Sequence, residues 1–274
     1  MTPAVIEPPF GTYALPPWAE TLRQIGLGAG RSALSRRLAS VTRRLCLLGR
    51  TGPVDVEPFP GQRARLYPQD NLSEKRVFGA PQFWDAAERL ALAGARAGDD
   101  FYFVDAGANV GLYTLAVRSH GPAKIIAIEP DPENLSRLRD NLEASGADEV
   151  IIAPIALSAE EGTASLAEGD GNRGETTAVA GPGDILARPL HHIIDEAGWP
   201  RIDALKIDIE GAEEPVLAAF FKSAPPALWP RMVLIEAHRG AETRALALLR
   251  SEGYIVAQRT RLNAILHLTN AQDS

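Results

Sequence analysis

The residues of this chain whose types and spacing suit chemistry form a glycine-rich turn and a set of acids that follow apolar runs. The turn lies within Phe101 to Thr114 (FYFVDAGANVGLYT), where an apolar run ends at Asp105, and Gly107 and Gly111 bracket Asn109. The apolar run is typical of a parallel strand buried on both faces, and a helix-forming segment follows the turn. Glycines let the backbone approach a ligand closely, and the N–H groups at a helix start attract negative charge. The sequence therefore predicts the front half of a nucleotide-binding strand–turn–helix unit.

The spacing of this turn discriminates between classes of cofactor. It reads G-x-N-x-G, with Asn109 in the place of the second glycine of a dinucleotide fingerprint, so the pattern G-x-G-x-x-G is not met. A loop that keeps a side chain, beside an acid at the strand end, suits a ligand without a pyrophosphate. S-adenosylmethionine is such a ligand, and a carboxylate such as Asp105 can hold or orient its ammonium group. We therefore expect S-adenosylmethionine, and a NAD-dependent oxidoreductase with the same type of fold is the alternative.

Further polar residues follow the later apolar runs of the chain, namely Glu129, Asp208, Glu236 and His238. Because ligands of an open α/β sheet bind outside the carboxyl ends of its strands, we expect these side chains to share one crevice with Asp105. Glu129 ends the second strand, where a carboxylate suits the two hydroxyls of an adenosine ribose. A solvated acid or a helix N-cap is the alternative role for Glu129.

Strands and helices must alternate to bring these residues together, and the sequence alternates in this way from residue 101 onward. We expect an α/β fold with a mostly parallel seven-stranded sheet and helices on both faces. The predicted strands are 101–104, 124–128, 149–154, 203–207, 231–235, 254–258 and 264–268. The fourth and fifth of these strands are expected beside the first.

Two connections between these strands have their own predicted structure. Residues 155–166 are expected to form a short hairpin that turns at Glu161-Gly162. Residues 169–184 (GDGNRGETTAVAGPGD) form a long polar loop that we expect at the mouth of the crevice as a lid. Its side chains suited to a polyhydroxylated acceptor are Asn172, Arg173, Glu175, Thr176 and Thr177.

The first hundred residues are expected to form an extension that caps the cofactor site, with residues 101–274 as the catalytic domain. Prolines make residues 1–18 an irregular arm. Helices are predicted over 18–25, 31–48 and 81–97, and a β-hairpin over 54–67 around Pro60-Gly61. In the second helix, a row of apolar side chains spaced by four and three residues comprises Leu34, Leu38, Val41, Leu45 and Leu48. We expect this row to pack on the main domain, and a basic helix on a membrane surface or a partner protein is the alternative.

Composition excludes several classes of protein. The net charge of -7 argues against general binding of nucleic acid, which needs a basic surface. Cys46 is the single cysteine, so the sequence holds no internal disulfide and no multi-cysteine metal site. No apolar run approaches the roughly 20 residues of a membrane span, and the N-terminus does not resemble a signal peptide. We therefore expect a cytoplasmic protein without an integral membrane segment, and we leave open whether it forms a homo-oligomer.

Five stretches of the chain together resemble the FkbM family of methyltransferases. They are VDAGANVGLYT (104–114), IEPDPEN (128–134), LRDNLE (138–143), LKIDIEGAE (205–213) and LIEAH (234–238). The resemblance implies a Rossmann-like class I fold, S-adenosylmethionine as cofactor, and methylation of hydroxyl oxygens on sugars or polyketides. It also implies that Asp105, Gly107, Asn109 and Gly111 line the methionine end of the cofactor, and that Glu129 takes its ribose.

Methyl transfer to a hydroxyl requires an aligned acceptor that loses its proton, and a general base adds about 10²- to 10⁴-fold to the rate. His238 is the predicted base because its ordinary pKa lies near neutrality, and Asp208 and Glu236 are expected to orient it or the acceptor. A histidine that only caps the strand is the alternative. Asp208 with Glu236 or His238 would suit Mg²⁺ instead, although we favour catalysis without a metal. Glu210 is a further candidate, whose alternative role is to complement the start of a helix.

The sequence thus predicts an S-adenosylmethionine-dependent O-methyltransferase that acts on a hydroxylated small molecule. A methyltransferase with a nitrogen acceptor is disfavoured. Such enzymes have Asn or Asp, then Pro-Pro and an aromatic residue, after the fourth strand, where this chain has Asp208-Ile209-Glu210-Gly211.

Overall fold

The computed structural model describes residues 8–28, 30, 32–96, 98, 100–167, 177–238 and 241–269. The chain divides into two compact units. Unit 1 comprises residues 1–84 and 140–147, and unit 2 comprises residues 85–139 and 148–274. The first half of the predicted lid, including Asn172, Arg173, Glu175 and Thr176, lies outside the described residues.

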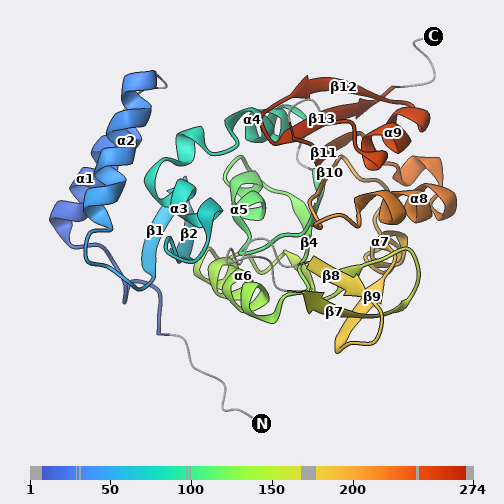
Figure 1. Cartoon of the computed structure of the whole chain (residues 1–274), viewed down its shortest axis with the longest axis horizontal. Coiled ribbons are helices and arrows are strands. Elements are labelled where there is room, and N and C mark those ends of the chain that lie inside the picture. The colour runs from blue at the N-terminus through green and yellow to red at the C-terminus, as the bar shows by residue number, and fades with distance from the viewer. Residues whose placement is uncertain are drawn as a thin grey trace. The chain divides into compact units, whose positions relative to one another are not determined.

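Unit 1 combines a pair of helices with a hairpin. Helices α1 (Pro17–Gly28) and α2 (Ala33–Cys46) lie side by side, and strands β1 (Val54–Phe59) and β2 (Gln62–Leu66) pair antiparallel (Figure 1). These elements confirm the helices and the hairpin predicted for this region. A third helix, α3 (Leu72–Gly79), was not predicted, and its start is capped by Asn71, whose Oδ1 accepts hydrogen bonds from the N–H groups of Ser73 and Glu74.

The apolar row of α2 differs from its prediction. Ala39, Thr42 and Cys46 are the buried residues of this helix, whereas the side chains of the apolar row are exposed. The prediction that this row packs on the main domain is therefore wrong, because the row is exposed. Small residues allow the close approach of α1 and α2, and this packing turns the larger side chains outward.

A buried ion pair joins the hairpin to the N-terminal arm. Arg65 Nε donates to Asp55 Oδ1 at 2.8 Å, and Arg65 Nη2 donates to Asp55 Oδ2 at 3.1 Å. The same Oδ2 accepts hydrogen bonds from the N–H groups of Gly11 (2.7 Å) and Tyr13 (3.0 Å). Burial acts to raise the pKa of Asp55, but these hydrogen bonds outweigh it and the pKa is lowered. The carboxylate therefore stays charged and ties three segments of unit 1 together.

Unit 2 is built on a seven-stranded sheet with the order β12-β13-β11-β10-β3-β4-β5. Its strands are β3 (Tyr102–Ala106), β4 (Lys124–Ile128), β5 (Ile151–Ala153), β10 (Ala204–Ile207), β11 (Met232–Glu236), β12 (Tyr254–Arg259) and β13 (Asn263–Leu268). All pairings are parallel except those that β13 makes with β11 and β12. The predicted seven-stranded, mostly parallel sheet is confirmed. The fourth predicted strand (β10) does lie beside the first (β3), but the fifth (β11) pairs with β10 and not with β3.

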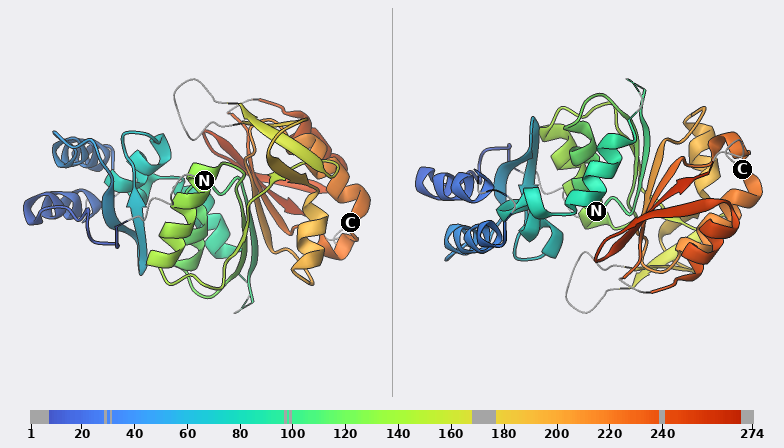
Figure 2. Two further views of the ribbon diagram at one scale, coloured as in Figure 1. Left: turned by 90° about the horizontal axis from the view of Figure 1, so that it is seen from below. Right: turned by 90° about the horizontal axis from the view of Figure 1, so that it is seen from above.

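Helices cover both faces of this sheet, as predicted (Figure 2). Those on one face are α4 (Ala86–Gly94), α5 (Leu112–Arg118) and α6 (Pro132–Ala144), and those on the other are α7 (Leu190–Glu196), α8 (Glu213–Ser223) and α9 (Arg244–Ser251). Because side chains alternate along a strand, Val104 and Ala106 join the apolar core under α7, α8 and α9, and Asp105 faces α5. This alternation decides which strand-end residues are buried beneath α5.

Three local predictions for unit 2 and its start are wrong. The helix predicted over 81–97 is interrupted: a 3₁₀ turn (Pro81–Phe83) precedes α4, and Asp85 between them has a left-handed φ of 40°. Residues 155–166 do not form a hairpin. Instead β6 (Ala156–Leu157), β7 (Gly162–Ala167), β8 (Thr177–Ala180) and β9 (Ile185–Arg188) form a separate sheet with the order β6-β9-β7-β8. Part of the predicted loop, Thr177–Ala180, is thus a strand that pairs with β7, whereas its role as a lid stays a prediction. Helix α7 was not predicted.

The ion pair of unit 1 gives a stability prediction. Asp55→Ala leaves the Arg65 guanidinium buried without its carboxylate, and we expect it to lower the free energy of unfolding by about 3–5 kcal/mol. Glu242→Ala is the matched control, because Glu242 pairs with Arg250 (2.7 Å) and Arg259 (3.1 Å) at an exposed site. The control should cost about 1 kcal/mol or less. Urea denaturation followed by circular dichroism measures both, and equal losses would contradict the prediction.

Candidate functional site

Strand register brings the predicted site residues to one edge of the sheet. Ala106 on β3 aligns with Ile207 on β10 and with Ile128 on β4, and Ile207 aligns with Ile235 on β11. The residues that follow these positions are Gly107, Glu129, Asp208 and Glu236. They stand in one row at the carboxyl ends of the parallel strands, where α/β folds bind their ligands.

The glycine turn has a backbone that only glycine accommodates at two positions. Gly107 and Gly111 have φ angles of +74° and +86°. A Cβ atom on Gly107 would lie 1.9 Å from the carbonyl oxygen of Asp208, and one on Gly111 would lie 2.6 Å from Leu138 Cδ1. The N–H groups of Gly107 and Ala108 donate to the carbonyl of Ile128 at 3.0 and 2.9 Å, which fixes the turn to the end of β4.

Glu129 fastens the same turn from its other side. Its Oε2 accepts a hydrogen bond from the N–H of Asn109 (2.7 Å), and its Oε1 accepts one from the N–H of Asp131 (2.9 Å). Asn109 has a left-handed φ of 52°, so this contact stabilises an unfavourable backbone conformation. Asp131, and not Glu129, accepts hydrogen bonds from the first N–H groups of α6. Burial raises the pKa of Glu129 to about 7, although the two backbone donors favour its charged form.

Asp105 lies inside the fold rather than in an open crevice. The side chain is fully buried, and its Oδ2 accepts hydrogen bonds from the N–H (3.0 Å) and the hydroxyl (2.7 Å) of Thr114. Its Oδ1 has no hydrogen-bond partner among the described residues, and burial raises the pKa of this carboxyl. Asp105 therefore fastens the first turn of α5, and a direct contact with a ligand ammonium stays a prediction.

Sequence reasoning missed Lys206, which connects these groups. Its Nζ donates to the carbonyl of Gly107 at 2.7 Å, and it lies 3.5 Å from Asp208 Oδ2 and 4.0 Å from Asp105 Oδ1. Burial disfavours the charged lysine, but the carboxylates of Asp208 and Asp105 outweigh burial and raise the pKa of Lys206. A signal was present in the sequence, because a lysine within a buried strand needs a charged partner.

Tyr113 on α5 is a second residue that the sequence analysis missed. Its ring lies 5.7 Å from Lys206 Nζ, and its hydroxyl donates to Asp85 Oδ2 at 2.8 Å. Burial, together with the negative charges of Asp85 and Glu88, raises the pKa of Tyr113 well above its ordinary value. The hydroxyl therefore stays protonated and donates to Asp85 at neutral pH.

The predicted catalytic residues separate into two groups. His238 Nε2 lies 3.5 Å from Glu236 Oε1, so the structure brings these two together. Asp208 instead pairs with Lys206. The His238 side chain is 71% exposed, and that of Glu236 is 35% exposed. Burial and the negative charge of Asp208 raise the pKa of Glu236.

The loop after β10 has a further strained position. Glu210 has a left-handed φ of 54°, and Gly211 follows it with a φ of +99°. The Glu213 carboxylate accepts hydrogen bonds from the N–H groups of Ile209 and Gly211, at 2.9 and 3.0 Å for the shorter contacts. Glu213, in the first turn of α8, therefore fixes the loop that presents Asp208 and Glu210.

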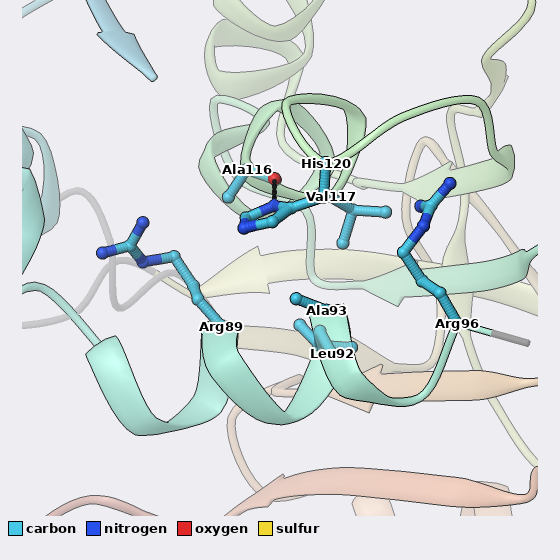
Figure 3. Close-up of a pocket in the computed structure, with 7 residues that line it drawn as sticks. All are labelled: Arg89, Leu92, Ala93, Arg96, Ala116, Val117 and His120. Atoms are coloured by element: carbon cyan, nitrogen blue, oxygen red, sulfur yellow. Dashed lines mark hydrogen bonds between the residues drawn. The ribbon is translucent and has the colours of Figure 1, made fainter. Parts of the chain in front are cut away.

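The described residues lack a cluster that could hold a metal ion, and a pocket that they form between two helices lies apart from this row. Within the described ranges, no three His, Cys, Asp or Glu side chains gather closely enough to hold a metal ion. A narrow pocket between α4 and α5 is lined by Leu92, Ala116 and Val117 and flanked by His120 (Figure 3). It lies at the C-terminal end of α5, whereas the glycine turn precedes the N-terminal end of that helix.

The close contact at Gly107 gives a prediction for the turn. Gly107→Ala forces a methyl group against the Asp208 carbonyl, so the turn must shift. Gly198→Ala is the matched control, because Gly198 also has a left-handed φ (+63°) but nothing within 4 Å of an added Cβ. The control should cost about 1–2 kcal/mol of stability for its backbone conformation alone, and Gly107→Ala should cost clearly more. Thermal and urea unfolding measure both losses of stability. Equal losses would show that the clash of the added methyl group with the Asp208 carbonyl costs no stability.

Comparison with known proteins identifies methyltransferases among the proteins similar to this chain. The profile of the Methyltransferase FkbM domain matches residues 105–256. Methyltransferase 1 of Beauveria bassiana is 26% identical over 184 residues, which cover 58% of this chain and 74% of that protein. Methyltransferase sdnD of Sordaria araneosa is 30% identical over 197 residues, which cover 57% of this chain and 74% of that protein.

Among solved structures, the chain is similar to Methyltransferase FkbM from Methylobacillus flagellatus KT, with a TM-score of 0.42 and 18% identity. That match covers 84% of this chain and 60% of the other. The family profile spans more than half of the 274 residues and includes the glycine turn, Glu129, Asp208, Glu236 and His238. The chain is therefore an enzyme with a Rossmann-like class I methyltransferase fold, and it belongs to the FkbM family of methyltransferases.

Proposed function

We propose that this methyltransferase transfers the methyl group of S-adenosylmethionine to a hydroxyl oxygen of a small molecule such as a sugar or a polyketide. The observation that supports it best is the left-handed glycine turn, whose Asn109 N–H is bound by the strand-end carboxylate of Glu129. The resemblance to the FkbM family implies the same cofactor and the same kind of acceptor.

The residues at this edge fit such a cofactor. Gly107 and Gly111 let the turn lie tightly against Asp208 and Leu138, where a Cβ atom would clash, and so give it its left-handed shape at the strand ends. Glu129 offers a carboxylate beside the turn for the ribose hydroxyls, and the Asp105 Oδ1 atom is a buried acceptor without a hydrogen-bond partner among the described residues. When bound, the cofactor supplies a methyl group that its sulfonium has already activated. The protein must then align the acceptor and remove its proton.

We assign the removal of the proton to His238. Its exposed imidazole can reach an acceptor, and Glu236 at 3.5 Å can orient the ring and stabilise its charged form. Asp208 stands in the same row, 3.5 Å from Lys206, and is suited to hold an acceptor hydroxyl. In the alternative, Asp208 binds Mg²⁺ together with Glu236 or His238. The tests below distinguish this metal-dependent mechanism from base catalysis by His238.

Residues 1–100 and the connection over 169–184 remain our candidates for recognition of the acceptor. The first is proposed as a cap on the cofactor site, and the second as a lid. Neither role is needed for the cofactor predictions that follow.

The first functional prediction concerns the cofactor and its pH dependence. Calorimetry should detect binding of S-adenosylmethionine and no binding of NAD. If Glu129 holds the ribose as a carboxylate with a pKa of about 7, affinity should fall about tenfold as the pH is lowered from about 8 to about 6, because the protonated acid loses an acceptor.

Glu129→Gln should weaken binding by about 1.5–3 kcal/mol and remove this pH dependence. Glu160→Gln, an exposed acid beyond β6, is the control and should change neither. Binding of NAD in place of S-adenosylmethionine would exclude the proposed function. A pH profile that Glu129→Gln leaves unchanged would exclude only the role of Glu129.

The second functional prediction concerns His238. His238→Ala should lower turnover of a hydroxylated acceptor by about 10²-fold or more and leave the affinity for S-adenosylmethionine nearly unchanged. His267→Ala, which removes another exposed histidine on β13, is the matched control. Turnover is measured as release of S-adenosylhomocysteine with a panel of sugars and polyketides.

A chelator distinguishes the metal alternative. Loss of activity with a chelator, and its recovery with Mg²⁺, would indicate that a metal ion held by the acids, and not His238, promotes loss of the acceptor proton. Unchanged turnover in His238→Ala together with insensitivity to chelator would contradict both assignments.

A further inference from the structure

Helix α2 exposes a continuous apolar row, which we call the leucine face. Its members are Leu34 (75% exposed), Leu38 (41%), Val41 (52%), Leu45 (45%) and Leu48 (79%). The first four lie within α2, and Leu48 follows its end. Spacings of four and three residues place these side chains on one side of the helix. Single apolar side chains on a surface are ordinary, but a row along a whole helix indicates a site of interaction.

The other sides of α2 are already in contact with unit 1. Ala39, Thr42 and Cys46 are buried, and Cys46 Sγ contacts the carbonyl of Ala19 in α1 at 3.2 Å. The packing of α1 and α2, which lie side by side in Figure 1, therefore uses the small residues of α2 and leaves the leucine face exposed.

Two arginines occupy the side opposite to the leucine face. The guanidinium of Arg36 lies 5.2 Å from the centre of the Phe83 ring, and the stem of Arg43 lies against Gly79 at the end of α3. In helical projection both arginines fall about half a turn from the leucine face. The leucine face thus points away from the part of unit 1 that α2 packs on.

The charged residues of α2 that border the leucine face are positive. Arg37 and Arg44 are exposed, lie seven residues apart and flank the apolar row along one edge. Helix α2 itself holds no acidic residue. Residues 17–50 contain seven arginines and one glutamate, in a chain with 28 basic and 35 acidic residues. A basic segment is therefore set within an otherwise acidic protein.

We propose that the leucine face binds the surface of an anionic lipid membrane. A helix with an apolar side and a basic border lies in the plane of the interface, with its apolar side chains at the acyl boundary and its arginines at the lipid phosphates. The 14 residues of α2 span about 21 Å, less than the hydrocarbon thickness of a bilayer, so the helix lies on the membrane. No helix of the described residues is long and apolar enough to cross one.

A second copy of the chain is a poorer occupant for this face. Two leucine faces packed against each other would bring Arg37 and Arg44 of both copies to the edges of the contact. Because α2 has no acid to pair with them, the charges would repel. Anionic lipid headgroups neutralise the same arginines.

Vesicle flotation of the full chain tests the proposal without cofactor or acceptor. Wild-type protein should float with phosphatidylcholine vesicles that contain phosphatidylglycerol, and much less with pure phosphatidylcholine. The double variant Leu38→Ser/Leu45→Ser should lose flotation by at least about tenfold. Its control is Leu90→Ser/Leu186→Ser, which removes two leucines that are 70% and 51% exposed in unit 2 and should float as the wild type does.

A second pair of variants tests the charge. Arg37→Gln/Arg44→Gln should weaken partition into the anionic vesicles about thirtyfold, and added salt should weaken wild-type binding in the same direction. Arg139→Gln/Arg244→Gln, which removes two exposed arginines of unit 2, is the matched control. Circular dichroism confirms that each variant is folded.

The proposal is overturned if the wild type does not float with the anionic vesicles, or if Leu38→Ser/Leu45→Ser floats as well as its control. It is also overturned if the wild type is a dimer that ignores vesicles and that Leu38→Ser/Leu45→Ser dissociates. In that case the leucine face binds a second copy.

Discussion

Lys206 places one positive charge between two carboxylates at the edge of the sheet, and the polar row of the site depends on this charge. Asp105 is fully buried, and a buried carboxylate without a partner costs several kcal/mol. The ammonium lies 4.0 Å from Asp105 and 3.5 Å from Asp208, and it also binds the carbonyl of Gly107. A single side chain therefore links the start of the glycine turn to the loop that follows β10.

The glycine turn is held in an unfavourable conformation by contacts from both sides. Lys206 and Asp208 approach Gly107 closely, and Glu129 binds the N–H of Asn109. Such strain persists only where the surroundings fix it, and it is common at ligand sites. Because Glu129 is also the proposed ribose ligand, its backbone contacts and the cofactor would draw on the same carboxylate. Because the pKa of Glu129 is raised to about 7, protonation near neutral pH would remove an acceptor that the turn and the cofactor both use.

The two units satisfy burial in different ways. Unit 2 encloses an apolar core between its sheet and the helices α7, α8 and α9. Unit 1 combines buried apolar side chains, such as Leu66 and Phe78, with the buried pair of Asp55 and Arg65 and with the packing of small residues of α2 against α1. Close packing through small side chains leaves the larger ones of α2 outside, which is why a row that reads as core from its spacing forms an exposed surface.

The sequence by itself determined the sheet and the edge of the sheet at which the polar row lies. Apolar runs that end in Asp105, Glu129 and Glu236 indicated parallel strands, and the strand-end rule then placed their polar residues at one edge. The left-handed turn was also predictable, since Gly107 and Gly111 serve backbone conformations that other residues avoid. These signals are local, so they can be recognised in the sequence without knowledge of the fold.

Only the tertiary structure decided which way each of these residues faces and which partner it has. Alternation along β3 turns Asp105 beneath α5, and register with β10 brings Lys206 beside it from a hundred residues away. The break at Asp85 and the sheet of β6 to β9 likewise depend on pairing between distant segments. The exposure of the leucine face was undetermined for the same reason: periodicity shows that a helix has an apolar side, whereas the surface that covers it is set by the packing of the whole chain.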